Sequence, residues 1–138
     1  GPGMSIDDGR VQADFLRNVI RNEDIVLKSE GLAVRTYTYV SDAVAALFYI
    51  LLNSQELVYN IASEESTVSI RELAQTLVDA YPERNLKLVF DLPKADENTG
   101  CAPFTLGILN SDKIRKLGWK PSYTLKEGLM RTVAYLEE

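Results

Sequence analysis

A predicted strand passes directly into a predicted helix within the stretch Leu32-Ala33-Val34-Arg35-Thr36-Tyr37-Thr38-Tyr39-Val40-Ser41-Asp42-Ala43. The alternation of polar residues with aromatic and β-branched ones predicts an extended segment over residues 34–40. Ser41 or Asp42 is then expected to cap a helix whose interior, residues 43–52, is apolar on nearly every side. Such a helix is predicted to lie in the core, covered on more than one face.

Upstream of this stretch, the sequence predicts one helix and one more strand. The helix is expected to begin at Asp7 or Asp8 as N-cap and to end near Asn22, because apolar residues recur at helical spacing between them. Residues 25–27 form a short extended segment. Gly31 can supply the positive φ of a tight connection, so we interpret this segment and the following strand as a hairpin or a strand-turn-strand unit.

The second half of the chain carries the clearest helix signals. Capping boxes, in which an N-cap hydroxyl is followed by Glu three residues later, occur at Ser69-Ile70-Arg71-Glu72 and Thr124-Leu125-Lys126-Glu127. A shorter helix is expected over residues 110–117, and strands over 57–62 and 86–90. Residues 91–107 show no convincing periodicity. About five helices and four strands in mixed order predict the α/β or α+β class.

Length, composition and charge describe an ordinary globular domain. The chain has 138 residues, of which 46% are hydrophobic and 25% are charged, which is enough for one domain with its own core. A formal charge of -5 without a run of basic residues argues against a nucleic-acid partner. The longest apolar run is about half the length needed to cross a bilayer, which argues against a membrane partner.

Histidine is absent, and Cys101 is the single cysteine. An internal disulfide, a Cys/His zinc site, and Ser-His-Asp or Cys-His catalysis are therefore excluded for this chain. A reducing, cytoplasmic location fits this cysteine usage. The sequence also contains no Walker loop, metal-ligand cluster or glycine-rich dinucleotide fingerprint. The remaining functional candidates are basic and polar residues in strands or beside turns.

Two polar side chains in predicted strands are the first candidates for ligand binding. Arg35 follows the Gly31 turn and alternates with Tyr37, so its planar guanidinium could face a phosphate. The alternative is a surface arginine on an edge strand. Asn60 stands in the apolar segment Val58-Tyr59-Asn60-Ile61-Ala62, where its amide must find hydrogen-bond partners. It either belongs to a binding site or bonds a neighbouring loop.

Four motifs in the right order resemble those of one enzyme family. They are Gly1-Pro2-Gly3-Met4, similar to Y-G-P-x without its Tyr; the segment from Arg35 to Asp42, as R-x-x-x-Y-V-x-D; residues 58–62, as V-Y-N-I-A; and Ser111 to Pro121, as S-x-K-x-x-x-L-G-W-x-P. The family is that of the extended short-chain dehydrogenase/reductase enzymes acting on sugar nucleotides, namely the NAD-dependent epimerases, dehydratases and decarboxylases. Asp7-Asp8-Gly9-Arg10-Val11 is similar to a segment of UDP-glucuronate decarboxylases.

The resemblance implies that the chain is part of a longer enzyme. Family members carry G-x-x-G-x-x-G and a catalytic Y-x-x-x-K in a dinucleotide-binding half, and this sequence contains neither motif. Residues 1–138 are thus expected to form a single C-terminal substrate-binding domain, a small mixed α/β lobe lacking most of the Rossmann half. The parent would use NAD to epimerise, dehydrate or decarboxylate a sugar nucleotide through a keto-sugar intermediate. This chain alone is expected to bind no cofactor and to be inactive.

The resemblance also implies roles for four substrate-binding residues. Arg35 matches the family arginine that contacts the substrate diphosphate, and Asn60 matches a strand asparagine that reaches the substrate-side network. Arg10 stands where some relatives place a basic residue at the start of the nucleotide-covering helix; the alternative is a solvated first-turn arginine. Lys28 falls where relatives often carry an aromatic residue near the base or ribose, which is a departure from the pattern.

A second departure lies in residues 100–107. Many relatives carry an arginine-rich stretch there that clamps the diphosphate, whereas this segment contains no arginine. Lys94 is a candidate replacement. Phe104 and Leu106 could be apolar lid contacts or core anchors. Cys101 has no basic neighbour in sequence, so we interpret it as a bystander thiol rather than a nucleophile.

Two hypotheses from different classes follow. The first is that the chain supplies the nucleotide-sugar site, for a UDP-, dTDP- or similar sugar, of an NAD-dependent epimerase/dehydratase. The second is a stand-alone, non-catalytic binding or interaction module derived from that lobe. In either case, the face that would contact the missing Rossmann half is expected to be uncovered and available for self-association.

Overall fold

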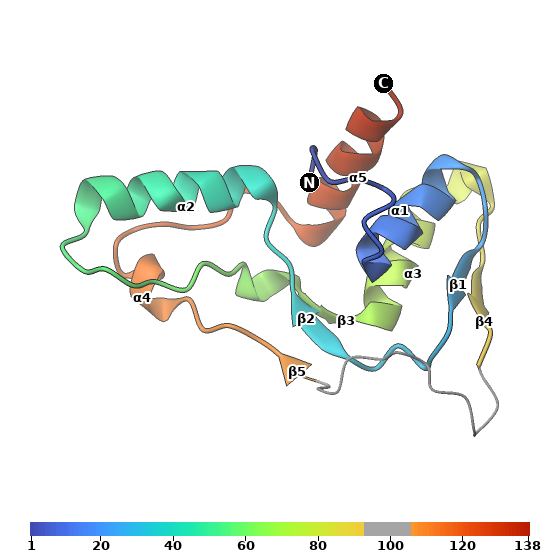
Figure 1. Cartoon of the computed structure of the whole chain (residues 1–138), viewed down its shortest axis with the longest axis horizontal. Coiled ribbons are helices and arrows are strands. Elements are labelled where there is room, and N and C mark those ends of the chain that lie inside the picture. Colours follow the sequence, from blue (N-terminus) through green and yellow to red (C-terminus); the bar gives the residue numbers. More distant parts are fainter. Residues whose placement is uncertain (93–105) are drawn as a thin grey trace.

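The computed structural model describes residues 1–92 and 106–138, and these form a mixed α/β arrangement (Figure 1). Its helices are α1 (Val11–Ile20), α2 (Val40–Asn53), α3 (Ile70–Ala80), α4 (Asp112–Arg115) and α5 (Leu125–Leu136), with 3-10 turns η1 (Glu64–Ser66) and η2 (Pro82–Arg84). Helices α1, α3 and α5 pack against one another, whereas α2 and α4 lie on the other side of the molecule (Figure 1).

Two small sheets connect these helices. Strand β1 (Ile25–Leu27) pairs in parallel with β4 (Leu88–Phe90). Strand β2 (Val34–Thr36) is the middle strand of the second sheet, antiparallel to β3 (Thr67–Ser69) and parallel to β5 (Leu106–Gly107). The predicted hairpin is therefore wrong, because β1 and β2 lie in different sheets and each finds a partner far away in sequence.

The main core lies where α1, α3 and α5 meet β1. Its fully buried side chains include Leu16 and Val19 of α1, Ile25 of β1, Leu73 and Leu77 of α3, and Val133 of α5. These apolar positions recur every three or four residues along each helix, so each helix presents one continuous stripe to the core. The helical spacing seen in the sequence is confirmed here.

Both predicted capping boxes are confirmed. The Ser69 hydroxyl accepts a hydrogen bond from the Glu72 amide at 3.1 Å, and the Glu72 carboxylate accepts one from the Ser69 amide at 2.7 Å. Thr124 and Glu127 form the same reciprocal pair at the start of α5. Each box satisfies amide groups that no helical carbonyl can reach, which is why both helices begin where the sequence predicts.

Three other expectations about secondary structure are wrong. Helix α1 has Arg10 rather than Asp7 or Asp8 as its N-cap, and α2 has Tyr39 as its N-cap. Residues 57–62 form no strand, because no other strand of the described chain pairs with them. They are instead attached through Lys113, whose Nζ donates to the Val58 carbonyl at 2.8 Å.

Helix α2 departs most from its prediction. Only one side of α2 is covered. On that side Ala46 packs with Ile114 and Trp119 in a small second core, and Ile50 packs against this core. Leu47 and Leu51, which the sequence places in a covered helix, are 59% and 75% exposed. Within the described residues, the expectation of cover on more than one face is therefore wrong. No helix in that part of the chain combines the length and apolar character needed to span a bilayer.

Asp42 holds the N-terminal end of α2 in place. It is 3% exposed, and its carboxylate accepts hydrogen bonds from the amides of Ser122 at 3.0 Å and Tyr123 at 3.1 Å. Its backbone carbonyl also accepts one from the Trp119 indole at 3.2 Å. Asp42 thus joins α2 to the segment before α5 instead of capping its own helix.

Candidate functional site

Arg35 occupies the centre of the three-stranded sheet. It lies in β2 opposite Val68 of β3 and Gly107 of β5, and its guanidinium donates to the Val34 carbonyl at 2.7 Å. The side chain is half-buried and has a further interaction within the structure. The alternative of an arginine on an edge strand is wrong, because β2 has a neighbour on each side.

Tyr37 lies two residues after Arg35 on the same extended segment, where alternate side chains point to the same face. Burial raises the pKa of the Tyr37 phenol above its ordinary value, and the positive charge of Arg35 opposes that rise. The two groups are therefore close enough to interact electrostatically. Arg35 and Tyr37 therefore belong to one polar stretch of the chain that runs from β2 to the start of α2.

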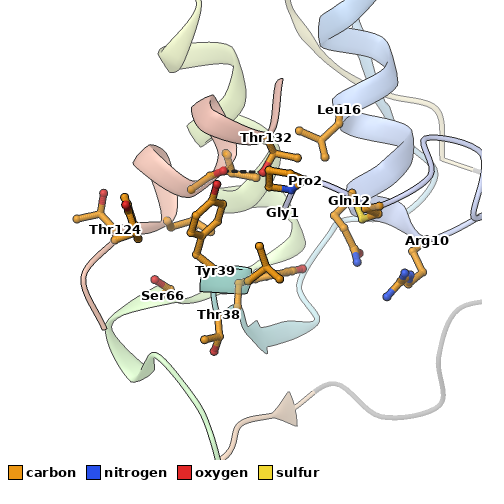
Figure 2. A pocket seen from close by; sticks show the side chains of 17 residues that line it. Gly1, Pro2, Arg10, Gln12, Leu16, Thr38, Tyr39, Ser66, Thr124 and Thr132 are labelled. Atoms are coloured by element: carbon orange, nitrogen blue, oxygen red, sulfur yellow. Dashed lines mark hydrogen bonds between the residues drawn. The ribbon is translucent and has the colours of Figure 1, made fainter. Parts of the chain in front are cut away.

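Tyr37 also lines a cavity of about 370 Å³ between α1, α5 and the start of α2 (Figure 2). Figure 2 shows Arg10 and Gln12 on the α1 side of this cavity and Thr124 on the α5 side. The opposite wall is aromatic, because the rings of Tyr39 and Tyr123 meet with centroids 4.9 Å apart. A cavity of this size, with mixed polar and apolar walls, is in the range of small-molecule sites.

The absence of a side chain at Gly128 shapes the aromatic wall. A Cβ at this position would lie 3.0 Å from the Tyr39 ring, closer than ordinary van der Waals contact. The adjacent turn is closed by Thr132, whose hydroxyl donates to the Gly128 carbonyl at 2.7 Å. Tyr39 therefore lies directly against the α5 backbone, and the cavity keeps its width.

Arg10 is the one predicted site residue that lines this cavity. Its Nε donates to the Asp8 carboxylate at 2.8 Å, and its side chain is 65% exposed. The hydrogen bond from Arg10 holds the pKa of Asp8 below its ordinary value. Asp8 therefore keeps its charge and orients Arg10 at the cavity, and an incoming anion would compete with Asp8 for this guanidinium.

Lys28 and Asn60 are placed away from the cavity. Lys28 is exposed and directly follows β1, which is a strand of the two-stranded sheet. Asn60 is also exposed, and its side-chain amide donates to the Asn110 carbonyl at 3.2 Å, which matches the loop-bonding alternative. The structure therefore brings Arg10 and Tyr37 to one cavity and places Arg35 within electrostatic reach of Tyr37, but Arg35, Lys28 and Asn60 do not line this cavity.

Glu64 forms a polar clamp between η1 and α4, close to the Asn60 contact. Its carboxylate accepts hydrogen bonds from the Ser111 amide at 2.6 Å and the Ser111 hydroxyl at 2.7 Å. Arg115 donates to the same hydroxyl at 3.0 Å. The Ser111 amide, and then its hydroxyl, hold the pKa of Glu64 below its ordinary value of 4.5.

This clamp predicts a loss of stability in acid. A carboxylate whose pKa is lower in the folded than in the unfolded chain adds stability above the unfolded pKa, and that stability is lost as the pH falls through the folded pKa. Glu64→Gln should lower the urea midpoint at pH 7 and should make its decline between pH 6 and pH 3 shallower. Urea titrations at several pH values measure both effects. Glu138→Gln makes the same charge change at the C-terminus, and an equal flattening there would contradict the role of the clamp.

Sequence reasoning missed the part that Tyr37, Gln12 and Tyr123 play in the cavity. The alternation of Arg35 with Tyr37 in the sequence could have indicated Tyr37. No sequence signal indicated Gln12 and Tyr123, because only the packing of α1 against α5 brings them together.

The remaining predictions concern residues 94–106. Leu106 is 64% exposed, which argues against a core anchor. The predictions for Lys94, Cys101 and Phe104 fall outside the described residues.

Comparison with known proteins identifies relatives across nearly the whole chain. Residues 1–62 match the model of the NAD dependent epimerase/dehydratase family. UDP-glucuronic acid decarboxylase 6 of Arabidopsis thaliana is 33% identical over 94% of this chain. That alignment covers 36% of the decarboxylase, so the chain spans little more than a third of the length of this relative.

Solved structures of sugar-nucleotide enzymes resemble this chain as well. The UDP-glucose 4-epimerase of Thermotoga maritima, solved with UDP-glucose, is 27% identical and matches 99% of this chain and 42% of its own with a TM-score of 0.78. The dTDP-glucose 4,6-dehydratase of Bacillus anthracis, solved in complex with NAD, is 20% identical and shares the fold with a TM-score of 0.76, over 99% of this chain and 41% of its own. The predicted α/β class is confirmed.

Proposed function

We propose that this chain, which belongs to the extended short-chain dehydrogenase/reductase family of NAD-dependent epimerases and dehydratases, forms the C-terminal nucleotide-sugar-binding domain of a longer enzyme. Residues 1–138 would then be one domain, and the parent would epimerise, dehydrate or decarboxylate its substrate through a keto-sugar intermediate. A cytoplasmic location stays a prediction from the cysteine usage.

The observation that carries this proposal is the cavity that Arg10 and Tyr37 line, with Arg35 two residues before Tyr37 in strand β2. Arg10 and Arg35 supply guanidinium groups at the cavity and in the adjoining strand β2 of a chain whose formal charge is -5, and an incoming phosphate would compete with Asp8 for the Arg10 guanidinium. A diphosphate carries its charge on oxygens that arginine binds in a bidentate manner. An uncharged sugar has no such oxygens, so the guanidinium groups would add little to its binding free energy. The proposed ligand is therefore a nucleoside diphosphate sugar, bound mainly through its phosphates.

NAD does not fit the residues of this chain. The sequence contains neither G-x-x-G-x-x-G nor Y-x-x-x-K, and the described strands and helices include no glycine-rich turn from a parallel strand into a helix. We therefore assign NAD to the remainder of the parent enzyme and derive no step through it here. The role proposed for Arg10, Arg35 and Tyr37 is binding and orientation of the substrate.

Calorimetric titration of the 138-residue chain tests this proposal. UDP-glucose and dTDP-glucose should each give saturable binding, UDP should compete, and free glucose and NAD should give no heat of binding. Adding NAD together with the sugar nucleotides should yield no product, because the chain lacks the catalytic pair. Failure of every nucleotide sugar to bind would contradict the binding role. Turnover by this chain alone would contradict its assignment as the non-catalytic part of the parent.

A further inference from the structure

Asp8 and Arg10 are joined by three contacts across a single intervening residue. The Oδ1 atom of Asp8 accepts a hydrogen bond from the backbone amide of Arg10 at 2.8 Å. The Oδ2 atom accepts one from the Arg10 Nε at 2.8 Å and lies 2.5 Å from the Arg10 Nη2. Both carboxylate oxygens therefore contact one residue, and this residue lines the cavity at the start of α1 (Figure 2).

Gly9 supplies the backbone conformation that this arrangement needs. Its φ is +78°, which residues with a side chain rarely adopt. A Cβ at Gly9 would have no heavy atom within 4 Å, so the backbone angle, and not a lack of space, favours glycine here. Because the chain turns at Gly9, the Asp8 carboxylate reaches the side chain of Arg10. The contact is thus formed by three consecutive residues.

The Asp8 carboxylate occupies the part of Arg10 that a phosphate would use. Nε and Nη2 form one edge of the guanidinium, and arginine binds carboxylates and phosphates through such paired N–H groups. The backbone amide of Arg10 adds a third donor to the same carboxylate. Asp8 therefore shows which anion geometry this end of the cavity accepts, namely two neighbouring oxygens of one charged group.

The neighbouring acidic side chains have a different partner. Asp7 lies 3.5 Å from the Nη1 of Arg17, and Asp14 lies 2.6 Å from its Nη2. The side chain of Asp7 is 73% exposed, whereas that of Asp8 is 18% exposed. Among the acidic residues that the structure describes, Asp8 alone forms an ion pair with Arg10.

We propose that Asp8 is an internal counter-ion of Arg10 that a substrate phosphate displaces, so that Asp8 limits the affinity of the cavity for nucleoside diphosphate sugars. This inference rests on the proposed function, because it takes the displacing anion from that substrate. The Arg10 side chain is 65% exposed, and ion pairs at exposed positions contribute little free energy, so the exchange has a small cost. After the exchange, the negative charge of Asp8 stays close to the phosphate and opposes its binding.

Asp8→Asn tests this proposal, because it removes the charge of Asp8 and nearly keeps its size. This variant of the 138-residue chain should bind UDP-glucose about 3- to 5-fold more tightly in calorimetric titration, the effect of losing one exposed ion pair. Asp7→Asn is the matched control. It makes the same change of net charge one residue away, but Asp7 contacts Arg17 instead of Arg10, so salt should screen most of its effect.

A double-mutant cycle with Arg10→Ala separates the direct contact from the general field of the acidic residues. In the Arg10→Ala chain, the counter-ion has no guanidinium to occupy. Asp8→Asn should then change the affinity for UDP-glucose no more than Asp7→Asn does. Circular dichroism and urea unfolding verify that each variant folds.

The outcomes separate this inference from the proposed function. Tighter binding by Asp8→Asn that disappears in the Arg10→Ala chain supports the counter-ion role. Unchanged or weaker binding by Asp8→Asn, an equal gain for Asp7→Asn, or a gain that persists without Arg10 would overturn it. In those cases, binding of UDP-glucose by the unmutated chain leaves the proposed function standing. If neither the unmutated chain nor Asp8→Asn binds UDP-glucose or dTDP-glucose, both are wrong.

Discussion

Asp42→Ala is expected to lower the free energy of unfolding by about 3 kcal/mol, because a hydrogen bond to a charged group contributes about 1.5–3 kcal/mol and two are lost. The Asp42 carboxylate is buried and accepts from the amides of Ser122 and Tyr123. Without it, the amides of the exposed Ser122 and the half-buried Tyr123 lose their partner, and partial access of water to these amides keeps the loss near the lower end of the range for each bond. The higher helix propensity of alanine returns only about 0.5 kcal/mol. Urea unfolding followed by circular dichroism measures the difference.

Asp42→Asn separates the loss of hydrogen bonds from the loss of side-chain volume. Asparagine has nearly the same size and keeps one acceptor oxygen, so it should cost clearly less than alanine. Fluorescence of Trp119, the single tryptophan, gives a second signal because its indole donates to the Asp42 carbonyl. A change within about 0.5 kcal/mol for Asp42→Ala, typical of surface positions, would show that this contact does not hold α2 in place.

Arg35→Ala is expected to weaken binding of UDP-glucose by about 1.5–3 kcal/mol, roughly 10- to 150-fold in affinity. The physical reason is the loss of charge-assisted hydrogen bonds to the diphosphate. Arg35→Lys should recover only part of the affinity, since an ammonium group is a point charge and cannot reproduce a bidentate contact. Calorimetric titration of the 138-residue chain measures both variants.

Arg21→Ala provides the matched control for Arg35→Ala, because Arg21 is an exposed arginine at the C-terminal end of α1. It removes the same charge and should leave affinity unchanged. Unfolding of each variant is measured in parallel, since Arg35 also donates to the Val34 carbonyl within β2. If Arg35→Ala and the unmutated 138-residue chain bind every nucleotide sugar with equal affinity, the role of Arg35 is structural and confined to the sheet.

The candidate site was only partly predictable from sequence. Arg10 and Arg35 were identifiable as cations beside turns, and the family motifs gave them roles. The sequence could not show that Arg10 contacts Asp8 at the cavity while Asn60 bonds a loop carbonyl. Such distinctions depend on which backbone segment comes within about 3 Å of a side chain, a distance set by the packing of whole elements.

By itself, the sequence determined the features that depend on neighbouring residues. The capping boxes at Ser69 and Thr124, the positive φ of Gly31 and the apolar stripes of α1, α3 and α5 all follow from contacts within about one helical turn or one tight connection. Local energies decide these features before the chain is compact, so the residues concerned are sufficient to predict them.

Tertiary structure alone decided the features that need a distant partner. Strand β1 pairs with β4 instead of β2, residues 57–62 form no strand, and α2 is covered on one side only. An extended segment becomes a strand only when another segment satisfies its amides and carbonyls, and an apolar helix is buried only where other elements reach it. Both conditions depend on the spatial arrangement of segments 50 or more residues apart, and apolar character along the sequence cannot specify which side of a helix receives cover.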